Sequence, residues 1–368
     1  MEDQNSILTT FSMNKFRQLI ILTPGFPADE KDTSCISTLQ DFVLGWQSAF
    51  PDLKIDIITF QYPHESKKYR WHKLSVYAAG GKDKGGVHRL YTWLKVFLYL
   101  LRMHKNKQAI VLSYFLTEAA IIGWLFSKVS GMRHVAIAAG QDVTKENKYL
   151  RWLAAVNTSI VVFNEKMKEA LYASSRIKAS AVIPMGVSRV ILPGPLASNR
   201  NIDVLFAGSL IPVKQPTLAI QIISQLQHEF KALHAEIAGD GSERSHVLQL
   251  INELQLTGNI AFNGQLKREE VFAKMKHAKI LLHTSIFEGQ SAVITEALQA
   301  GMYVVCFDVG RITDHPKVHV CKNRDEMLHA LETILHNPQS DFSPVNFPAM
   351  SSTVIEYSKL FNQLLSAR

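Results

Sequence analysis

Short apolar runs alternate with longer stretches of helical periodicity along almost the whole chain. This alternation predicts strands followed by helices, and therefore parallel sheets covered by helices on both faces. In the first half of the chain the expected strands lie at 19–23, 55–60, 109–113, 134–138, 159–163 and 181–183. In the second half they lie at 204–207, 235–238, 260–262, 280–283, 303–307 and 318–321.

A turn-rich segment at 187–199 separates the two series of strands, and we interpret it as a linker. With 368 residues, the chain is long enough for two domains of common size. We therefore expect one α/β domain in residues 1–190 and a second in residues 200–350.

The end of the chain predicts one more helix, from Thr353 to Leu365. Its apolar residues recur at helical spacing and mark one buried face. They are Val354, Tyr357, Phe361 and Leu364.

Two carboxylates flank a predicted turn between the strand at 280–283 and a helix at about 290–300. Glu288 lies in the turn, and Glu296 lies eight residues later on the helix, which Gly301 should end. Ligands of open α/β sheets bind at the carboxyl ends of strands, where this turn falls. Backbone N–H groups and the dipole of the helix favour an anion there.

A nucleotide sugar would use both the anion site and the two carboxylates. The amides of Gly289, Gln290 and Ser291 would hold diphosphate oxygens. Glu288 would accept a hydrogen bond from a sugar hydroxyl, and Glu296 from the ribose hydroxyls. The alternative is a solvated turn residue and an exposed helix residue. That alternative is favoured for either glutamate alone, but their shared strand–turn–helix setting favours ligand binding.

A second phosphate contact is expected in the segment from Gly208 to Lys214, which follows the strand at 204–207. Glycine lets the backbone approach a ligand closely, and Lys214 could reach a phosphate. Taken alone, the motif is more typical of a surface lysine after a tight turn. Its position in the same domain as Glu288 favours the phosphate role, with Gly208, Ser209 and Lys214 as donor-binding residues.

Two other glycine turns follow predicted strands. The turn containing Gly239 and Gly241 matches a dinucleotide fingerprint only in part, because Arg244 stands at the third glycine position. We interpret it as a tight turn that lines the donor site, with Gly241 as a donor-binding residue. In the first half, Gly25 follows the first strand and would let a loop close over the phosphates.

An acceptor contact is expected from Gly140, Gln141 and Asp142, which follow the strand at 134–138. Asp142 could orient an acceptor hydroxyl. An N-cap for a helix starting near Lys145 explains the aspartate equally well.

Composition describes an ordinary globular chain, with 47% hydrophobic and 20% charged residues. The first residues lack the apolar core of a secretory signal, and no apolar run approaches the ~20 residues that span a bilayer. Cys35, Cys306 and Cys321 show no metal-binding spacing, and no Asp-x-Asp pair occurs. These features predict a reduced cytoplasmic location and no bound metal or cofactor.

The net charge of +8 is concentrated in one segment. Residues 64–107 hold eleven Lys or Arg against one Glu and one Asp, a balance of +9. Such a concentration predicts a polyanionic partner, namely a membrane surface, a lipid diphosphate or a nucleic acid. Nucleic acid is not favoured, because no recognition motif accompanies the charge.

The same segment predicts a basic amphipathic helix at 87–105. An interfacial helix on anionic lipid has this composition, which would make the protein peripheral at the inner face of the cell membrane. The alternative is a helix whose apolar stripe packs on the core. The stripe consists of Leu90, Leu94, Phe97 and Leu101, and the basic residues expected on the membrane or acceptor side are Lys67, Lys68, Arg70, Arg89, Lys95 and Arg102.

With these elements in place, the chain resembles the retaining nucleotide-sugar glycosyltransferases of family 4, which have the GT-B fold. Glu288 and Glu296 match the paired-glutamate signature of that family, with its seven-residue gap. The segment 208–214 matches the phosphate-binding element in spacing, although Ser209 replaces the usual arginine. Segments 183–187 and 140–142 resemble the family's Pro-Asn-Gly-Val and His-Gly-x-Asp regions.

The resemblance implies an α/β fold of two Rossmann-like parallel-sheet domains facing a central cleft, with the acceptor in the first domain and the donor in the second. Residues 351–368 would pack back on the first domain. The implied reaction is metal-independent hexosyl transfer, with retention, from a nucleoside diphosphate sugar to a lipid-linked or polysaccharide acceptor of the cell envelope. Glu288, Lys214 and Asp142 would be its catalytic residues.

Two other functions remain open. A GT-B-like nucleotide-sugar epimerase would need its own set of catalytic acids and bases, which the sequence does not offer convincingly. A non-catalytic nucleotide-sugar or polyanion-binding protein is favoured by Ser209 and by the polar turn at 288–291.

Overall fold

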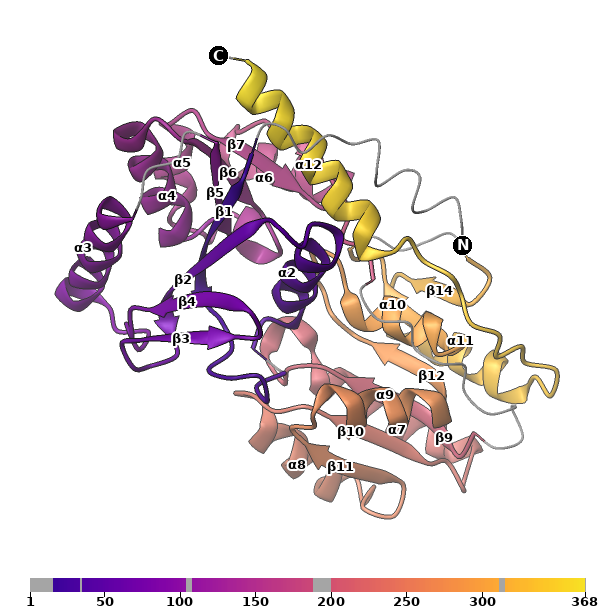
Figure 1. Ribbon diagram of the computed structural model, residues 1–368. Helices are drawn as coiled ribbons and strands as arrows, with labels where there is room; N and C mark the ends of the chain where they lie inside the picture. Colours follow the sequence, from indigo (N-terminus) through magenta and orange to yellow (C-terminus); the bar gives the residue numbers. More distant parts are fainter. Residues whose placement is uncertain (1–15, 34, 104–107, 188–199, 311–314, 368) are drawn as a thin grey trace. The chain divides into compact units, whose positions relative to one another are not determined.

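The computed structural model describes residues 16–33, 35–103, 108–187, 200–310 and 315–367 (Figure 1). The chain forms two compact units, the first from Met1–Ser188 and Pro348–Arg368, the second from Arg189–Phe347. Apart from Val187, the predicted linker lies outside the described residues.

The first unit contains an eight-stranded sheet with the order β3-β4-β2-β1-β5-β6-β7-β8. Neighbouring strands are parallel, except that β3 is antiparallel to β4. The six predicted strands are confirmed to within two residues at either end. The bounds are β1 Gln18–Gly25, β2 Lys54–Tyr62, β3 Lys67–Trp71, β4 Leu74–Ala78, β5 Ala109–Tyr114, β6 Arg133–Ile137, β7 Ser159–Val162 and β8 Ala181–Val182.

The hairpin formed by β3 and β4 was not predicted from the sequence. It lies in the basic segment, where charge obscures the period-two pattern of a strand. Lys68 and Arg70 are exposed on one face of β3, and Trp71 is buried on the other. Part of the basic segment is therefore the edge of the first sheet.

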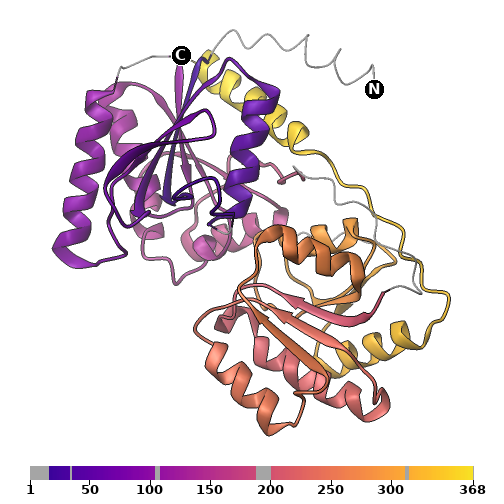
Figure 2. The same ribbon diagram turned by 60° about the horizontal axis from the view of Figure 1, so that its bottom comes forward.

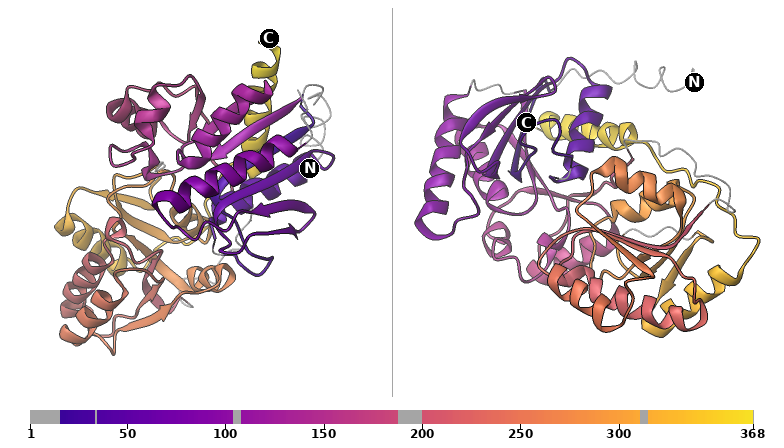
Figure 3. Two further views of the ribbon diagram at one scale, coloured as in Figure 1. Left: turned by 90° about the vertical axis from the view of Figure 1, so that its left-hand side faces the viewer. Right: turned by 90° about the horizontal axis from the view of Figure 1, so that it is seen from below.

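Helices cover both faces of this sheet. On one face, α3 (Gly86–Arg102) and α4 (Glu118–Ser130) pack against side chains of β1 and β5. Elsewhere in the unit, α12 (Met350–Ser366) packs on α2 (Ser37–Ala49), where the rings of Trp46 and Phe361 stack 5.7 Å apart (Figures 1 and 3). The final predicted helix therefore exists and contacts the first unit. The remaining helices are η1 Gln141–Val143, α5 Leu150–Ala154 and α6 Glu165–Ser175.

The second unit contains a six-stranded parallel sheet with the order β11-β10-β9-β12-β13-β14. All six strands predicted for this half are confirmed to within two residues. Their bounds are β9 Ile202–Ala207, β10 Ala235–Ala238, β11 Ile260–Gly264, β12 Ala278–His283, β13 Tyr303–Phe307 and β14 Val318–Cys321.

Two apolar clusters lie on opposite faces of the second sheet, because alternate residues of each strand point to opposite sides. Leu282 and Val305 face the helices on one side, and Leu281 and Val304 face those on the other. Figure 2 shows helices on both sides of this sheet. The first side is covered by α7 Pro216–Glu229, α8 Arg244–Glu253 and α11 Arg324–His336, the second by α9 Arg268–His277 and α10 Ala292–Gln299.

Candidate functional site

Lys214 is held at the carboxyl edge of the second sheet, where β9 and its neighbour β12 end. It closes the short helix η3 (Pro212–Lys214). The Thr284 hydroxyl donates to the carbonyl oxygens of Lys214, at 2.8 Å, and Gln215, at 2.9 Å. In addition, the Ile286 N–H donates to the Val213 carbonyl at 3.0 Å. The loop after β12 therefore fixes the turn that carries the lysine.

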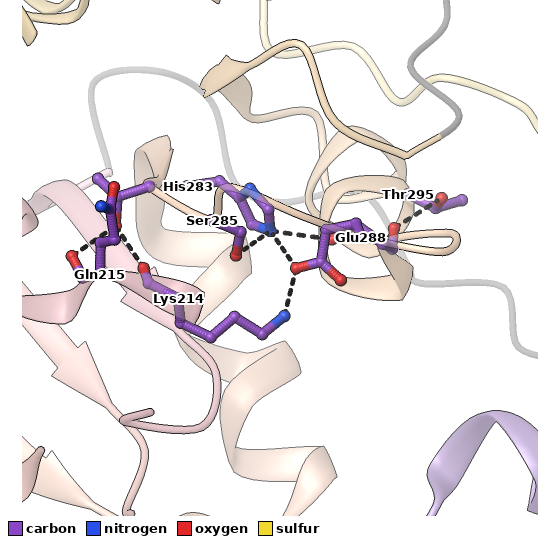
Figure 4. Close-up of polar contacts among 8 residues, drawn as sticks. Lys214, Gln215, His283, Ser285, Glu288 and Thr295 are labelled. Carbon is purple, nitrogen blue, oxygen red and sulfur yellow. Dashed lines mark hydrogen bonds and ion pairs between the residues drawn. The ribbon is translucent and has the colours of Figure 1, made fainter. Parts of the chain in front are cut away.

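Lys214 and Glu288, which the sequence assigned to one donor site, are direct partners. The Lys214 ammonium donates to Oε1 of Glu288, and His283 Nε2 lies 3.2 Å from the same oxygen. Figure 4 shows the ammonium and the imidazole directed at this carboxylate. The alternative of a merely solvated turn residue is wrong for Glu288, whose side chain is only 13% exposed.

The contacts keep Glu288 ionised despite its burial. Burial raises the pKa of this carboxyl group, but the hydrogen bond from His283 and the charge of Lys214 outweigh it and lower the pKa to about 2. The site therefore holds a carboxylate at every physiological pH.

His283 was counted in the sequence only as the last residue of an apolar strand. The structure buries it to 4% exposure beneath the turn. Its Nε2 lies 3.1 Å from the Ser291 hydroxyl and 3.4 Å from the Ser285 hydroxyl, while Nδ1 has no hydrogen-bond partner among the described residues. Since a carboxylate only accepts, Nε2 carries the proton in its contact with Glu288. A histidine at the end of an otherwise apolar strand was the available signal.

The turn after Glu288 leads into the N-terminus of α10. The predicted helix at 290–300 starts later, because Ser291 is the N-cap and its hydroxyl contacts His283 instead of capping the helix. Gly310, at φ 66°, leaves no spare room behind the turn, since a Cβ there would lie 3.2 Å from the Glu288 Cβ. Gly289 and Gln290 therefore lie in a packed turn at a helix N-terminus, and diphosphate binding by their amides stays a prediction.

Glu296 lies on α10 and is paired with an arginine that no sequence motif marked. Arg268 Nη2 donates to Glu296 Oε1 at 2.7 Å, and each of the two side chains is only 13% exposed. The arginine also lies over the Phe272 ring, 5.2 Å from its centre. The alternative of an exposed helix residue is therefore wrong for Glu296, and its ribose role stays a prediction.

The glycine turns of this unit differ in how much space they leave for a side chain. Leu210 and Gly208 donate backbone hydrogen bonds to Asp240 at 2.9 Å and Ala238 at 3.0 Å, so the loops after β9 and β10 are joined. At Gly241, with φ 154°, a Cβ would lie 2.4 Å from the Leu210 carbonyl oxygen.

This backbone contact explains why Gly241 is a glycine, and it supports the tight-turn interpretation over the dinucleotide fingerprint. By contrast, a Cβ at Gly208 would meet no heavy atom within 4 Å, and Ser209 is exposed. The Gly208 backbone therefore has open space next to it, but Ser209 adds no cation there.

In the first unit, Asp142 organises a loop. Its carboxylate accepts from the backbone N–H groups of Leu116 at 2.8 Å, Gly140 at 2.8 Å and Ala139 at 3.1 Å. Burial raises the pKa of Asp142, although these hydrogen bonds oppose the shift. The N-cap interpretation is wrong, because the next helix, α5, begins at Leu150. The described contacts of Asp142 are structural, and its catalytic role stays a prediction.

The other residues predicted in the first unit have simpler environments. Gly25 ends β1, where a Cβ would make ordinary contacts, the nearest at 3.5 Å with Tyr62. Its backbone therefore does not require glycine. Gln141 is exposed. Lys95 is not directed to solvent, since its ammonium donates to the Ser66 hydroxyl at 2.6 Å and the Ala79 carbonyl at 2.9 Å, and burial lowers its pKa.

Neither a metal site nor a membrane-spanning helix is found in the described part of the chain. Among those residues, His, Cys, Asp and Glu nowhere gather in threes or more as a metal site would require. No helix within the same residues has both the length and the apolar character to span a membrane.

Known proteins resemble both parts of this chain. Residues 193–343 match the family model described as glycosyl transferases group 1. The human phosphatidylinositol N-acetylglucosaminyltransferase has a subunit that is 24% identical over 276 residues, which cover 67% of this chain and 57% of the human one. The chain spans about half the length of the curated relatives it matches.

Solved structures extend the likeness to the whole fold. A sucrose-phosphate synthase from Thermosynechococcus elongatus has a TM-score of 0.75 at 17% identity, covering 96% of this chain and 100% of its own. HepE of Anabaena, solved with UDP and glucose, has a TM-score of 0.68 at 16% identity, covering 96% and 98% of the two chains. The chain thus has the GT-B fold of these proteins, and its second unit matches the glycosyl transferases group 1.

Proposed function

We propose that this protein is a glycosyltransferase that binds a nucleoside diphosphate sugar in its second unit. The observation that carries the proposal is the contact of Lys214 and His283 with one carboxylate oxygen of Glu288, at the carboxyl edge of a parallel sheet. Ligands of such sheets bind at this edge. The same unit holds the match to glycosyl transferases group 1.

The proposed chemistry uses charge rather than a covalent step by the protein. Lys214 and the accessible Gly208 backbone stabilise the diphosphate as it leaves. The side chain of Lys214 is 22% exposed, so an incoming phosphate can share its ammonium with Glu288. Glu288 stays ionised and accepts from a hydroxyl of the donor sugar, while Glu296 accepts from the ribose.

We further propose retention of configuration without a metal ion, as the resemblance to family 4 implies, and transfer of a hexose-type sugar. The relative named phosphatidylinositol N-acetylglucosaminyltransferase acts, by its name, on a lipid. A lipid-linked acceptor bound by the first unit is therefore favoured over a free polysaccharide.

A donor screen tests the proposal. The purified chain is mixed with UDP-, GDP- and ADP-sugars, and both its melting temperature and the release of nucleoside diphosphate are followed. One donor should stabilise the protein, and Lys214→Ala and Glu296→Ala should abolish that effect. Lys322→Ala and Glu253→Ala, at exposed positions of the same unit, should retain it.

The missing cation at Ser209 favours one other candidate, a non-catalytic nucleotide-sugar-binding protein. Stabilisation by a donor without nucleoside diphosphate release, across lipid and glycan acceptors, would support that candidate. A chain that no nucleotide sugar stabilises would contradict both.

A further inference from the structure

The outward face of α3 is apolar. Five large side chains on it are exposed by between 42% at Leu98 and 82% at Val87. Their spacing along the helix places them on one face. The opposite face carries Val96 and Leu100, which are buried in the core of the first unit. The exposed set, called here the α3 apolar face, is Val87, Leu90, Tyr91, Leu94 and Leu98.

This exposure contradicts one sequence-based alternative in part. Phe97 and Leu101 of the predicted stripe pack against the core of the first unit, as that alternative requires, but Leu90 and Leu94 are 59% and 55% exposed. The helix is therefore apolar on two sides, and only one side is covered by described residues. Contiguous exposed apolar patches of this kind mark interaction sites, because water contact with them is unfavourable. Figures 1 and 3 show α3 at the outside of the first unit.

The surroundings of the α3 apolar face are basic. The helix contains no Asp or Glu, and Arg102 is exposed at its end. Lys82 and Lys84 are exposed in the loop that enters the helix, on either side of the exposed Asp83. Beside the helix lies a hollow of about 370 Å³, whose lining includes Lys68 and Arg70 of β3 together with the acidic Asp56, as well as Tyr99 of α3.

We propose that the α3 apolar face lies in the surface of an anionic lipid bilayer, with the helix in the membrane plane. The apolar side chains enter the boundary between headgroups and acyl chains, and the basic residues around them contact lipid phosphates. A second copy of the chain fits this face less well, because pairing two such faces would bring two basic rims together.

The start of α3 is joined to the edge of the first sheet where an acceptor is expected. Arg89 donates to the Tyr149 hydroxyl at 3.3 Å, and that hydroxyl donates at 2.8 Å to the buried Glu118, which follows β5. A bilayer-bound α3 thus keeps the carboxyl edge of this sheet close to the lipid. Membrane docking does not depend on sugar transfer, so either proposal can fail while the other stands.

Vesicle binding by the full chain tests the proposal. Vesicles of phosphatidylcholine alone are compared with vesicles of equal parts phosphatidylcholine and phosphatidylglycerol, by co-sedimentation. The chain should bind the second kind and much less of the first. The double variant Leu94→Gln/Leu98→Gln should bind at least about tenfold more weakly. Lys82→Gln/Lys84→Gln should lose about fivefold for each charge.

The controls distinguish docking through α3 from nonspecific adsorption to vesicles and from folding defects. Leu254→Gln and Val320→Gln remove exposed apolar side chains of the second unit and should bind like the unaltered chain. Leu94→Ala/Leu98→Ala keeps helix-forming residues and should also bind more weakly. Unchanged vesicle binding in both Leu94/Leu98 variants would overturn the proposal. A dimer in lipid-free solution that the same variants convert to a monomer would overturn it as well, and would assign the face to a second copy.

Discussion

His283 Nε2 lies 3.2 Å from the Glu288 carboxylate oxygen that also accepts from Lys214. The histidine is buried, whereas the lysine retains some exposure. The two partners of Glu288 therefore differ in kind. Lys214 can turn toward a ligand, but His283 can only hold the carboxylate where it is. We infer that His283 positions Glu288 and that Lys214 meets the phosphates.

The first prediction concerns His283→Ala. Removing the imidazole leaves Glu288 tethered by Lys214 alone, so the carboxylate should move with the lysine. We expect kcat/KM for the donor to fall by about tenfold or more, because small misplacements of a contact group are costly. Steady-state kinetics with the donor found in the screen measure this effect.

A second buried histidine supplies the control for that variant. His134 pairs with Ser113 at 2.9 Å and Thr158 at 2.7 Å in the first unit. His134→Ala should lower the melting temperature but leave the donor affinity unchanged. If both variants alter donor kinetics in proportion to their loss of stability, His283 has no positioning role.

The second prediction is the pH dependence of Glu288. Its pKa falls from 4.5 to about 2 on folding, so its contribution to stability is complete above pH 4.5 and is lost as the pH falls toward 2. At neutral pH the shift corresponds to about 3 kcal/mol. Glu288→Gln should therefore unfold at lower urea concentration than the native chain at pH 7.

The difference in free energy of unfolding between the native chain and Glu288→Gln should shrink as the pH is lowered, with about half of it lost by pH 3. Urea unfolding at several pH values provides the measurement. Asp240→Asn, which removes an exposed carboxylate paired with Arg244, should change little at any pH. If the difference in free energy of unfolding between the native chain and Glu288→Gln does not change with pH, the ionised carboxylate is not what stabilises the turn.

The third prediction concerns the ion pair between Arg268 and Glu296. Since both side chains are largely buried, Arg268→Ala should leave the glutamate poorly compensated and cost about 1–3 kcal/mol. The double variant Arg268→Gln/Glu296→Gln should recover most of the loss, because the largely buried carboxylate charge is removed together with the arginine. Urea unfolding of the single and double variants measures both effects. If the single and the double variant lose equal stability, the arginine stabilises the unit through its packing on Phe272 instead.

Much of the fold was predictable because parallel strands buried on both faces are continuous apolar runs. Strands such as β5, which is buried throughout, stand out in the sequence for this reason. The β3–β4 hairpin was missed because Lys68 and Arg70 occupy an exposed edge, where charge replaces the apolar signal.

Only the site residues that lie in recognisable sequence motifs were predictable. Glu288 and Lys214 could be assigned to one edge of a sheet, since each follows a strand. Arg268 could not, because it is at the start of α9, and only the packing of α9 beside α10 brings it to Glu296. The sequence pattern identified only Leu90 and Leu94 of the α3 apolar face and grouped them with Phe97 and Leu101, which pack on the core. The side of the helix that packs on the sheet depends on tertiary contacts that no periodicity specifies.

The last prediction separates a structural from a catalytic role for Asp142. Three backbone N–H groups, from Leu116, Ala139 and Gly140, depend on this carboxylate. Asp142→Ala should cost about 1–3 kcal/mol, because it leaves three partly buried backbone donors without this acceptor. Asp142→Asn keeps one acceptor oxygen, so its loss of stability should be smaller, and activity should fall with stability in both variants. A catalytic carboxylate behaves differently: Asp142→Asn would then abolish turnover in a chain that melts close to the native temperature. Melting curves and initial rates of the two variants, measured side by side, distinguish the roles.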